Sequence, residues 1–231
     1  MLRALWLRWW LASVGLVLVA PVAHAGQAPF SATVAKVCRD TIARVEREQG
    51  IPKLLLSAIA LAETGRWHAE RGESIAWPWT VTSGKDSSYH PNKEAAIAHV
   101  RALQAKGVRN IDVGCMQVNL HHHRRAFESL EEAFDPEANV MYAASFLKTL
   151  QGDLKSWSRA VAHYHSATPE LHTRYKEKVD KLWQGERRRD AIERTESVMA
   201  AYRERQAKRE SDQAQRAMNR ANILSQLATS R

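Results

Sequence analysis

The sequence predicts a mainly α-helical protein built as one domain with a small insertion. Through most of the chain, apolar residues recur every three to four positions, as on one face of a helix. Glycine, proline and helix-capping residues punctuate this pattern. The stretch 66–92 departs from it because it is rich in tryptophan, proline and turn residues. That composition favours a small insertion that contains a short strand or a β-hairpin.

The chain begins with the organisation of a secretory signal peptide. Arg3 and Arg8 give a positive start, an uncharged apolar run follows, and Ala23-His24-Ala25 fits the small-x-small cleavage rule. The alternative is a membrane anchor, which needs about 20 apolar residues, and Pro21 cuts the run short. We therefore expect residues 1–25 to be removed near Ala25, and a periplasmic mature protein.

Two helices are expected before the insertion, at 31–49 and 53–63. The first has apolar residues close to the 3.6-residue period and is stopped by Gly50. Pro52 suits the first turn of the second helix, where a missing N–H costs little. The second helix is apolar almost all round, which indicates burial, and Gly65 is placed to end it in a left-handed cap.

The rest of the domain is expected to contain one short strand and four helices. Trp79-Thr80-Val81-Thr82 could be one arm of a hairpin, and Asn92 is a suitable N-cap. Asp135-Pro136 and Asp153 open the next two helices. The four helices are expected at 93–105, about 136–151, about 153–164 and about 169–183.

The composition changes at residue 185. We expect a globular domain at 26–184 and a charge-rich tail at 185–231, where apolar residues are sparse. Such a tail forms either a solvated helix or a disordered segment. Of the net charge of +9, Arg3 and Arg8 contribute +2 and the tail contributes +4, so the domain at 26–184 carries only about +3. This charge is too mild and too scattered to indicate nucleic acid, and it suits a polyanionic wall polymer only weakly.

Histidines and cysteines are candidate metal ligands or cross-links. His121-His122-His123 resembles a metal tract, but adjacent residues on a helix point in different directions, so no metal or organic cofactor is expected. Cys38 and Cys115 are the only cysteines. In an oxidising compartment they suggest one disulfide tying the first helix to the loop at 114–119; the alternative is two unpaired buried thiols.

Glu63 is the candidate general acid. Cleavage of a glycosidic bond needs an acid that is still protonated near neutral pH. Apolar surroundings raise the pKa of a carboxyl group because burial disfavours the charged form, and the negative end of a helix acts in the same direction. Glu63 follows an apolar helix and precedes Gly65. The competing interpretation is an ordinary surface glutamate.

A second motif, at 114–119, reads Gly-Cys-Met-Gln-Val-Asn. Gly114 permits close backbone approach, and Met116 can pack the loop onto the core. Gln117 and Asn119 offer amides that can bond sugar hydroxyl and acetamido groups. The competing interpretation is a helix start with incidental polar residues.

Together these strings resemble the soluble lytic transglycosylase family over about residues 35–183. Members carry Glu-Ser-Gly at the acid, and Glu63-Thr64-Gly65 differs only in its threonine. They carry Gly-Leu-Met-Gln-Ile/Val-Asn at the loop, which matches here except at Cys115. Their Tyr-Asn-Ala-Gly corresponds to 164–167, where only the tyrosine is kept. A later tyrosine of the family pattern corresponds to Tyr175.

The resemblance implies a lysozyme-like fold and cleavage of peptidoglycan between N-acetylmuramic acid and N-acetylglucosamine. Glu63 would act first as acid and then as base. Tyr164 would position Glu63 by a hydrogen bond and Tyr175 would border the cleft, while His165 would either titrate near neutral pH or pack as a neutral ring. The residues implied to meet substrate are Thr64, Met116, Gln117, Asn119, Tyr164, His165 and Tyr175.

The sequence is also compatible with two other functions. One alternative is a hydrolytic muramidase that cleaves the same bond with water. The other is a non-catalytic glycan-binding or scaffold protein, which the altered string at 164–167 permits. Trp77 and Trp79 suit either a cleft wall or the core of the insertion. Small members of the family often open the wall for flagella, secretion or conjugation machines, so the tail could bind an envelope partner.

Overall fold

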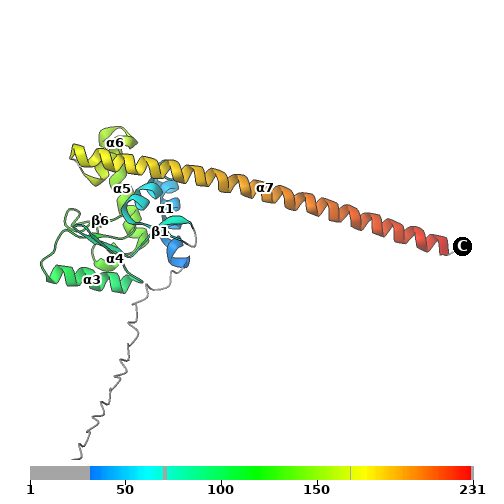
Figure 1. The fold of residues 1–231 in the computed structure, drawn as a ribbon, viewed down its shortest axis with the longest axis horizontal. Coiled ribbons are helices and arrows are strands. Elements are labelled where there is room, and N and C mark those ends of the chain that lie inside the picture. Colours follow the sequence, from blue (N-terminus) through cyan, green and yellow to red (C-terminus); the bar gives the residue numbers. More distant parts are fainter. Residues whose placement is uncertain (1–31, 70–71, 167, 230–231) are drawn as a thin grey trace, which may run out of the picture.

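The computed structural model describes residues 32–69, 72–166 and 168–229. The predicted signal peptide and its cleavage site lie outside these residues. Helices dominate and surround two small antiparallel sheets (Figure 1), so the predicted mainly α fold is confirmed. In chain order the elements are α1 (Ala32–Gln49), α2 (Leu55–Thr64), β1 (Gly65–His68), β2 (Glu73–Ala76), β3 (Thr80–Ser83), β4 (Asp86–Tyr89), α3 (Lys93–Ala105), β5 (Asp112–Val113), β6 (Val118–Asn119), α4 (Leu130–Ala133), α5 (Pro136–Leu154), α6 (Trp157–His165) and α7 (Pro169–Thr229).

Two apolar cores hold these elements together. The larger core lies among α1, α2, α5, α6 and the first part of α7, and it buries nearly all of the apolar face of α2. The smaller one lies between the four-stranded sheet and α3, with Val81, Val100 and Val113 at its centre. The catalytic candidates of α2 and of the loop 114–119 therefore sit on the larger core.

The buried carboxylate of Glu46 determines where α2 begins. The backbone N–H groups of Leu54 and Leu56 donate to it over 2.9 and 2.6 Å. Leu54 takes a left-handed conformation, with φ of 67°, and the helix starts at Leu55 rather than at the predicted residue 53. A side chain one helix away supplies the cap, which local sequence patterns do not reveal.

Gly65 ends α2, but the predicted left-handed cap is wrong. Its φ of −58° and ψ of 114° turn the chain directly into β1. A Cβ atom on this residue would lie 2.3 Å from the carbonyl oxygen of Leu61. Glycine is thus required here by close backbone approach and not by a positive φ.

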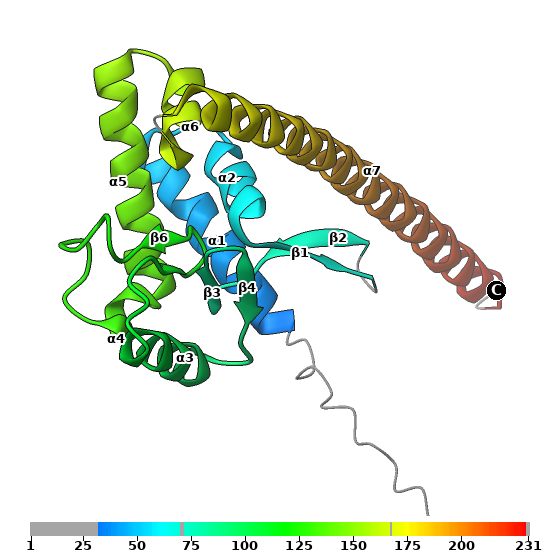
Figure 2. The same ribbon diagram turned by 60° about the vertical axis from the view of Figure 1, so that its left-hand side comes forward.

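The insertion contains two hairpins, formed by β1 with β2 and by β3 with β4 (Figure 2). The predicted hairpin strand at 79–82 corresponds to β3. Strand β3 also pairs with β5, which pairs with β6, so the sheet order is β4-β3-β5-β6. Trp77 is buried and its indole N–H donates to the carbonyl oxygen of His90 over 2.7 Å. Trp77 therefore belongs to the core of the insertion.

Side-chain caps set the starts of the later helices. The Asn92 carboxamide oxygen accepts from the N–H of Ala95 over 2.8 Å, as predicted for the start of α3. The boundary predicted at Asp153 is wrong, because α5 continues to Leu154. Lys155 then turns with φ of 52°, and the Ser156 hydroxyl caps α6.

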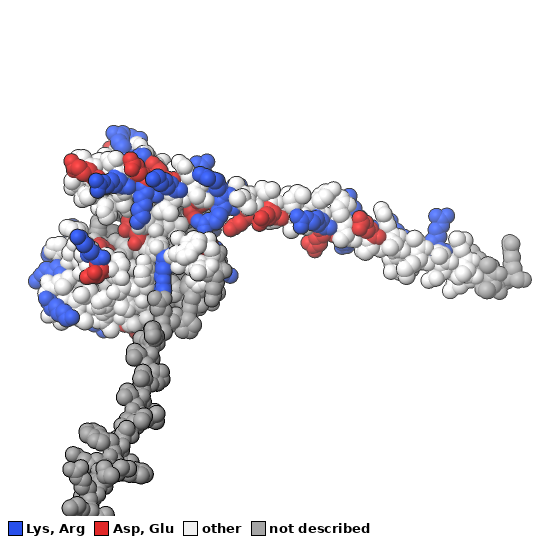
Figure 3. Space-filling view, viewed as in Figure 1, with Lys and Arg blue, Asp and Glu red and all other residues white. Residues whose placement is uncertain are grey.

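Helix α7 runs for 61 residues and passes through the predicted domain boundary at residue 185 without a break. Its first part packs against α2 and α6, and the rest projects away from the body (Figure 1). The tail, expected to be helical or disordered, is thus helical. On the face shown in Figure 3, acidic and basic side chains are interleaved along it.

Three contacts fix the direction in which α7 leaves the body. The Trp183 indole N–H donates to the carbonyl oxygen of Lys53 over 2.8 Å, and the Lys53 ammonium pairs with Asp190 at 2.6 Å. Arg189 lies 3.6 Å from a carboxylate oxygen of Glu73 on β2.

Within the described part of the chain, no helix is both long enough and apolar enough to cross a membrane.

Candidate active site

Glu63 lies at the meeting point of two hollows on the surface. On one side is a cleft of about 390 Å³, walled by β5, the loop 114–119, α5 and α6. On the other side is a hollow of about 650 Å³ beside β1 and the first part of α7. A chain of sugars lying across both hollows would pass over the Glu63 carboxyl group.

The surroundings of Glu63 raise the pKa of its carboxyl group into the neutral range. Burial raises its pKa to about 7, the Tyr175 hydrogen bond opposes this rise, and the charge of Asp112 adds to it. The Tyr175 hydroxyl donates to Oε1 of Glu63 over 2.5 Å. A pKa near 7 suits a group that must give up a proton and later take one back.

The two tyrosines differ from what the resemblance implied. The expected hydrogen bond from Tyr164 to Glu63 is wrong, because the Tyr164 hydroxyl donates to the backbone oxygen of Met116 over 3.1 Å. Tyr175 makes the bond to Glu63 instead. Tyr164 thus supports the loop, while Tyr175 orients the acid.

The buried side chain of Asn139 holds the loop 114–119 on the side away from the cleft. Gly114 has φ of 82°, and a Cβ atom there would lie 2.3 Å from the side chain of Asn139. Asn139 is fully buried, accepts from the Met116 N–H over 3.0 Å and donates to the carbonyl oxygens of Val113 and Ala133. Its amide thus pairs with three buried backbone groups, as buried polar groups require.

The predicted disulfide between Cys38 and Cys115 is present. The two Cα atoms lie 5.8 Å apart, and both residues are buried in the larger core. The bond ties α1 to the loop, so the loop is held covalently as well as by hydrogen bonds.

Three of the residues expected to bind substrate are buried: Tyr175, which holds Glu63, and two residues that lie under the site. Thr64 is 0% exposed, and its hydroxyl lies 3.1 Å from Ala60 O and 3.2 Å from Cys115 O. Met116 is also 0% exposed. Neither side chain lines the cleft; both instead join the acid-bearing helix and the loop to the core.

Gln117 and Asn119 do line the cleft, but much of their hydrogen-bonding capacity serves the protein itself. The Gln117 amide nitrogen donates to Thr80 O and Gly114 O. The Asn119 amide nitrogen donates to Asp112 Oδ1 over 2.7 Å, and its oxygen accepts from two backbone N–H groups. Both residues therefore shape the wall of the cleft.

His165 lies in the cleft and stacks flat on Tyr175, with ring centroids 4.7 Å apart and planes inclined by 9°. Burial lowers its pKa, although the charge of Asp112 acts in the opposite direction. The ring is thus biased toward its neutral form. Because it packs on the tyrosine that holds Glu63, it also supports the acid indirectly.

Sequence reasoning missed several residues of the cleft, most importantly Asp112. Burial raises the pKa of Asp112, and the Asn119 hydrogen bond lowers it. Asp112 stands between the apolar residues Ile111 and Val113, which is the alternation of a strand, but this strand is only two residues long, so the signal in the sequence is weak. The other cleft residues not singled out as site residues are Asn110, Val118, His122, His123, Tyr142, Ala143, Phe146 and His163.

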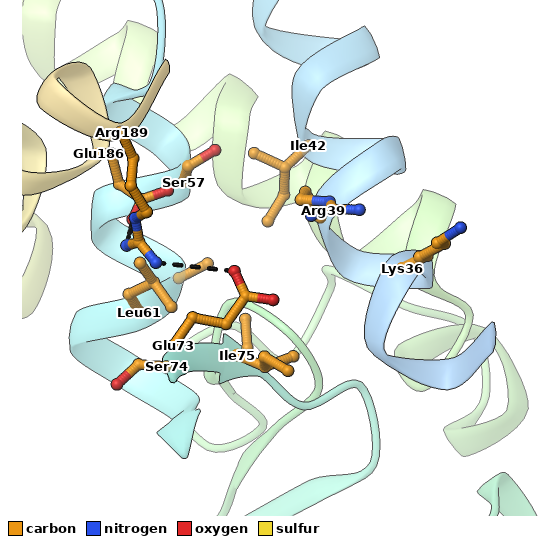
Figure 4. Close-up of a pocket in the computed structure, with 12 residues that line it drawn as sticks. Lys36, Arg39, Ile42, Ser57, Leu61, Glu73, Ser74, Ile75, Glu186 and Arg189 are labelled. Atoms are coloured by element: carbon orange, nitrogen blue, oxygen red, sulfur yellow. Dashed lines mark hydrogen bonds and ion pairs between the residues drawn. The ribbon is translucent and has the colours of Figure 1, made fainter. Parts of the chain in front are cut away.

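Glu73, another carboxyl group near the end of α2, belongs to a different place. It lines a small pocket between α1, α2, β2 and α7, where its carboxylate faces Arg189 (Figure 4). Arg189 also pairs with Glu186. The pocket does not include Glu63, so Glu73 is not a second acid of the cleft.

Across the described ranges, no group of three or more His, Cys, Asp and Glu side chains is arranged to hold a metal ion.

Comparison with protein families identifies the domain. Residues 79–183 match the model of the transglycosylase SLT domain, and this part of the chain belongs to that family. The family comprises lytic transglycosylases of peptidoglycan. The match contains the loop 114–119 and both tyrosines but begins after Glu63. No curated protein and no solved structure matches the chain.

Proposed function

We propose that this protein is an exported lytic transglycosylase that cuts the β-1,4 bond between N-acetylmuramic acid and N-acetylglucosamine in peptidoglycan. The observation that carries the proposal is Glu63, a carboxyl group with a pKa of about 7 at the junction of two hollows. The SLT domain at 79–183 supplies the substrate class. Glu63 is the general acid and then the base.

In the proposed reaction, Glu63 gives its proton to the oxygen of the bond that breaks. The acetamido oxygen of the muramyl residue bonds to C1 as the bond between C1 and the leaving sugar breaks. The electron pair of the broken bond stays on the leaving oxygen, which has received the proton of Glu63. The C6 hydroxyl oxygen then bonds to C1, the acetamido oxygen leaves, and Glu63 takes the hydroxyl proton. The product is a 1,6-anhydro sugar, and no water is consumed.

Asp112 favours a second candidate, a hydrolytic muramidase. Hydrolases of this kind commonly use two carboxyl groups, one of which activates water, and Asp112 shares the cleft with Glu63. The two functions differ in product, because hydrolysis leaves a reducing end. The non-catalytic alternative is less favoured because a scaffold has no need of a carboxyl group with a raised pKa.

Mass analysis of the products tests the proposal. Purified peptidoglycan is incubated with residues 26–231, with Glu63→Gln, and with Glu73→Gln as the matched control outside the cleft. Anhydro-muropeptides from the unmutated protein and from Glu73→Gln, but not from Glu63→Gln, are the expected result. Reducing-end products would establish the hydrolase, and full activity of Glu63→Gln would overturn the assigned role of the acid.

We further propose that the exposed part of α7 recruits the enzyme to an envelope machine, so that the wall is opened locally. This part carries exposed apolar side chains, among them Val198, Tyr202 and Leu224. Truncation after Thr195 keeps the contacts of Arg189 and Asp190 with the body. It should leave cleavage of purified peptidoglycan unchanged and abolish localisation of the protein in cells; unchanged localisation and assembly would remove the recruitment role.

A further inference from the structure

The second acid of the cleft, Asp112, has a fixed position. It lies on β5, which pairs with β3 on one side and with β6 on the other. Its neighbour Val113 is fully buried in the smaller core, whereas Asp112 is half-buried and faces the cleft that contains Glu63. Since strand pairing sets this alternation, the carboxylate is held by the sheet and not by a flexible loop.

Only one of the two carboxylate oxygens of Asp112 is used within the part of the chain that the structure describes. Oδ1 accepts from the Asn119 amide over 2.7 Å, and the same amide donates to Asn110 over 2.6 Å. Asn119 is itself fixed because its oxygen accepts from two successive N–H groups after the loop. The second oxygen of Asp112 is left to meet whatever occupies the cleft.

Asp112 determines the charge of the cleft around Glu63. Burial raises the pKa of Asp112, and the Asn119 hydrogen bond and the charges of His165 and His122 oppose this rise. Asp112 also interacts electrostatically with Glu63, whose pKa it raises. Lys178 is the cation that acts on Glu63. When Glu63 is protonated, Asp112 is therefore the negative charge that the cleft presents to a bound sugar.

We propose that Asp112 is a catalytic residue that accepts the N–H of the muramyl acetamido group. The inference rests on the proposed function. As the acetamido oxygen bonds to C1, positive charge spreads onto the amide nitrogen and its N–H becomes a stronger donor. A fixed carboxylate stabilises this charge, as preorganised groups do for transition states. Asp112 takes no proton, and Glu63 performs both proton transfers.

The carboxylate is the right kind of group for this task. An ionised carboxylate accepts hydrogen bonds and donates none, so it discriminates the acetamido N–H from the acetamido oxygen and orients that oxygen toward C1. Because Glu63 takes the proton of the C6 hydroxyl, the proposed reaction needs no second base. Its unmet need is a partner for the developing positive charge.

The test compares Asp112→Asn with the unmutated protein on two substrates. One is purified peptidoglycan; the other is the same material with its muramyl amino groups enzymatically de-N-acetylated, and chemical re-acetylation restores the first. On native material we expect kcat to fall by about 100-fold with KM little changed. On the de-N-acetylated material both proteins should be equally slow.

The pH profile gives a readout that a purely structural role would not move. Removing the negative charge of Asp112 should lower the pKa of Glu63, so the alkaline limb of the profile should move to lower pH. Asp86→Asn makes the same chemical change on an exposed strand of the same sheet, and it should alter neither quantity. Asp112→Glu should recover part of the lost rate, and melting temperatures will show whether each variant is folded.

Three results would overturn the proposal. They are an equal loss of rate on both substrates, an unchanged rate in Asp112→Asn, and a change of product between reducing-end and anhydro forms, which would make Asp112 a base toward water. Failure of the proposed function looks different. In that case the unmutated protein would release no soluble product from native peptidoglycan, whatever stands at position 112.

Discussion

The Tyr175 hydroxyl and the Glu63 carboxyl group form a 2.5 Å hydrogen bond across 112 residues of sequence. The bond joins α7 to the end of α2, so the helix that continues into the tail also holds the acid. The donated hydrogen bond favours the ionised carboxylate and opposes the effect of burial on its pKa. Tyr175 thus sets both the direction and the acidity of Glu63.

Replacing Tyr175 by phenylalanine should therefore raise the pKa of Glu63 further. We expect the alkaline limb of the kcat/KM profile to move up by about one pH unit, since a lost hydrogen bond is worth about 1–2 kcal/mol. The rate at the optimum should fall by about tenfold because the acid is less well oriented. Tyr164→Phe is the control: its hydroxyl serves Met116 O, and its alkaline limb should stay in place.

The pKa of Glu63 predicts the pH dependence of both activity and stability. A general acid must be protonated, so kcat/KM should fall about tenfold per pH unit above pH 7. The raised pKa in the folded state gives stability that is complete below the ordinary value of 4.5 and is lost as pH rises through about 7.

Glu63→Gln carries no such charge. Its advantage in unfolding free energy over the unmutated protein should grow between pH 5 and pH 8, to at most about 3 kcal/mol. Urea unfolding at three pH values measures it. An advantage independent of pH would contradict a raised pKa.

Thr64 should matter for stability and turnover but not for substrate affinity. Its hydroxyl lies near two carbonyl oxygens and accepts from the Trp77 N–H over 3.3 Å. Thr64→Val keeps the shape and removes these bonds, so it should cost about 1–3 kcal/mol and lower kcat. Thr64→Ser should behave like the unmutated protein. A rise in KM without loss of stability would instead indicate contact with substrate.

Loss of the Cys38–Cys115 disulfide should weaken the fold measurably. It closes a loop of 77 residues, for which chain entropy predicts about 4 kcal/mol of stabilisation. Guanidinium unfolding of Cys38→Ser/Cys115→Ser should show this difference, and a reducing agent should lower the midpoint of the unmutated protein only. Equal midpoints under both conditions would mean that the bond contributes nothing to stability.

Local patterns predicted the helices well where the determinants are local. Asn92 and Asp135 cap the helices that they were expected to start. The local patterns failed where a residue distant in sequence determines the structure, as at the start of α2, where Glu46 of α1 supplies the cap. Gly65 shows a third case: the residue was correctly singled out, but close approach to Leu61 explains it and not a left-handed turn.

The candidate site shows the same division. The acid could be found because an apolar helix ending in glutamate is visible in sequence. The tyrosines could not be told apart, because which hydroxyl reaches Glu63 depends on how α6 and α7 pack on α2. Asp112 was overlooked since a two-residue strand is too short to stand out. Thr64 and Met116 were assigned to substrate although burial, which sequence does not give directly, puts them beneath the site.

The long helix α7 also turns the domain into one end of a rod. Its root is held at Lys53 and Glu73, and the 61 residues of the helix rise about 1.5 Å each. The part beyond Asp190 therefore extends roughly 60 Å. A partner bound at the far end would be held at a fixed distance from the domain, and a tilt of about 10° at the root of α7 would displace that end by roughly 10 Å. The length and the tilt of α7, more than binding affinity, would then determine which glycan strands the cleft can contact.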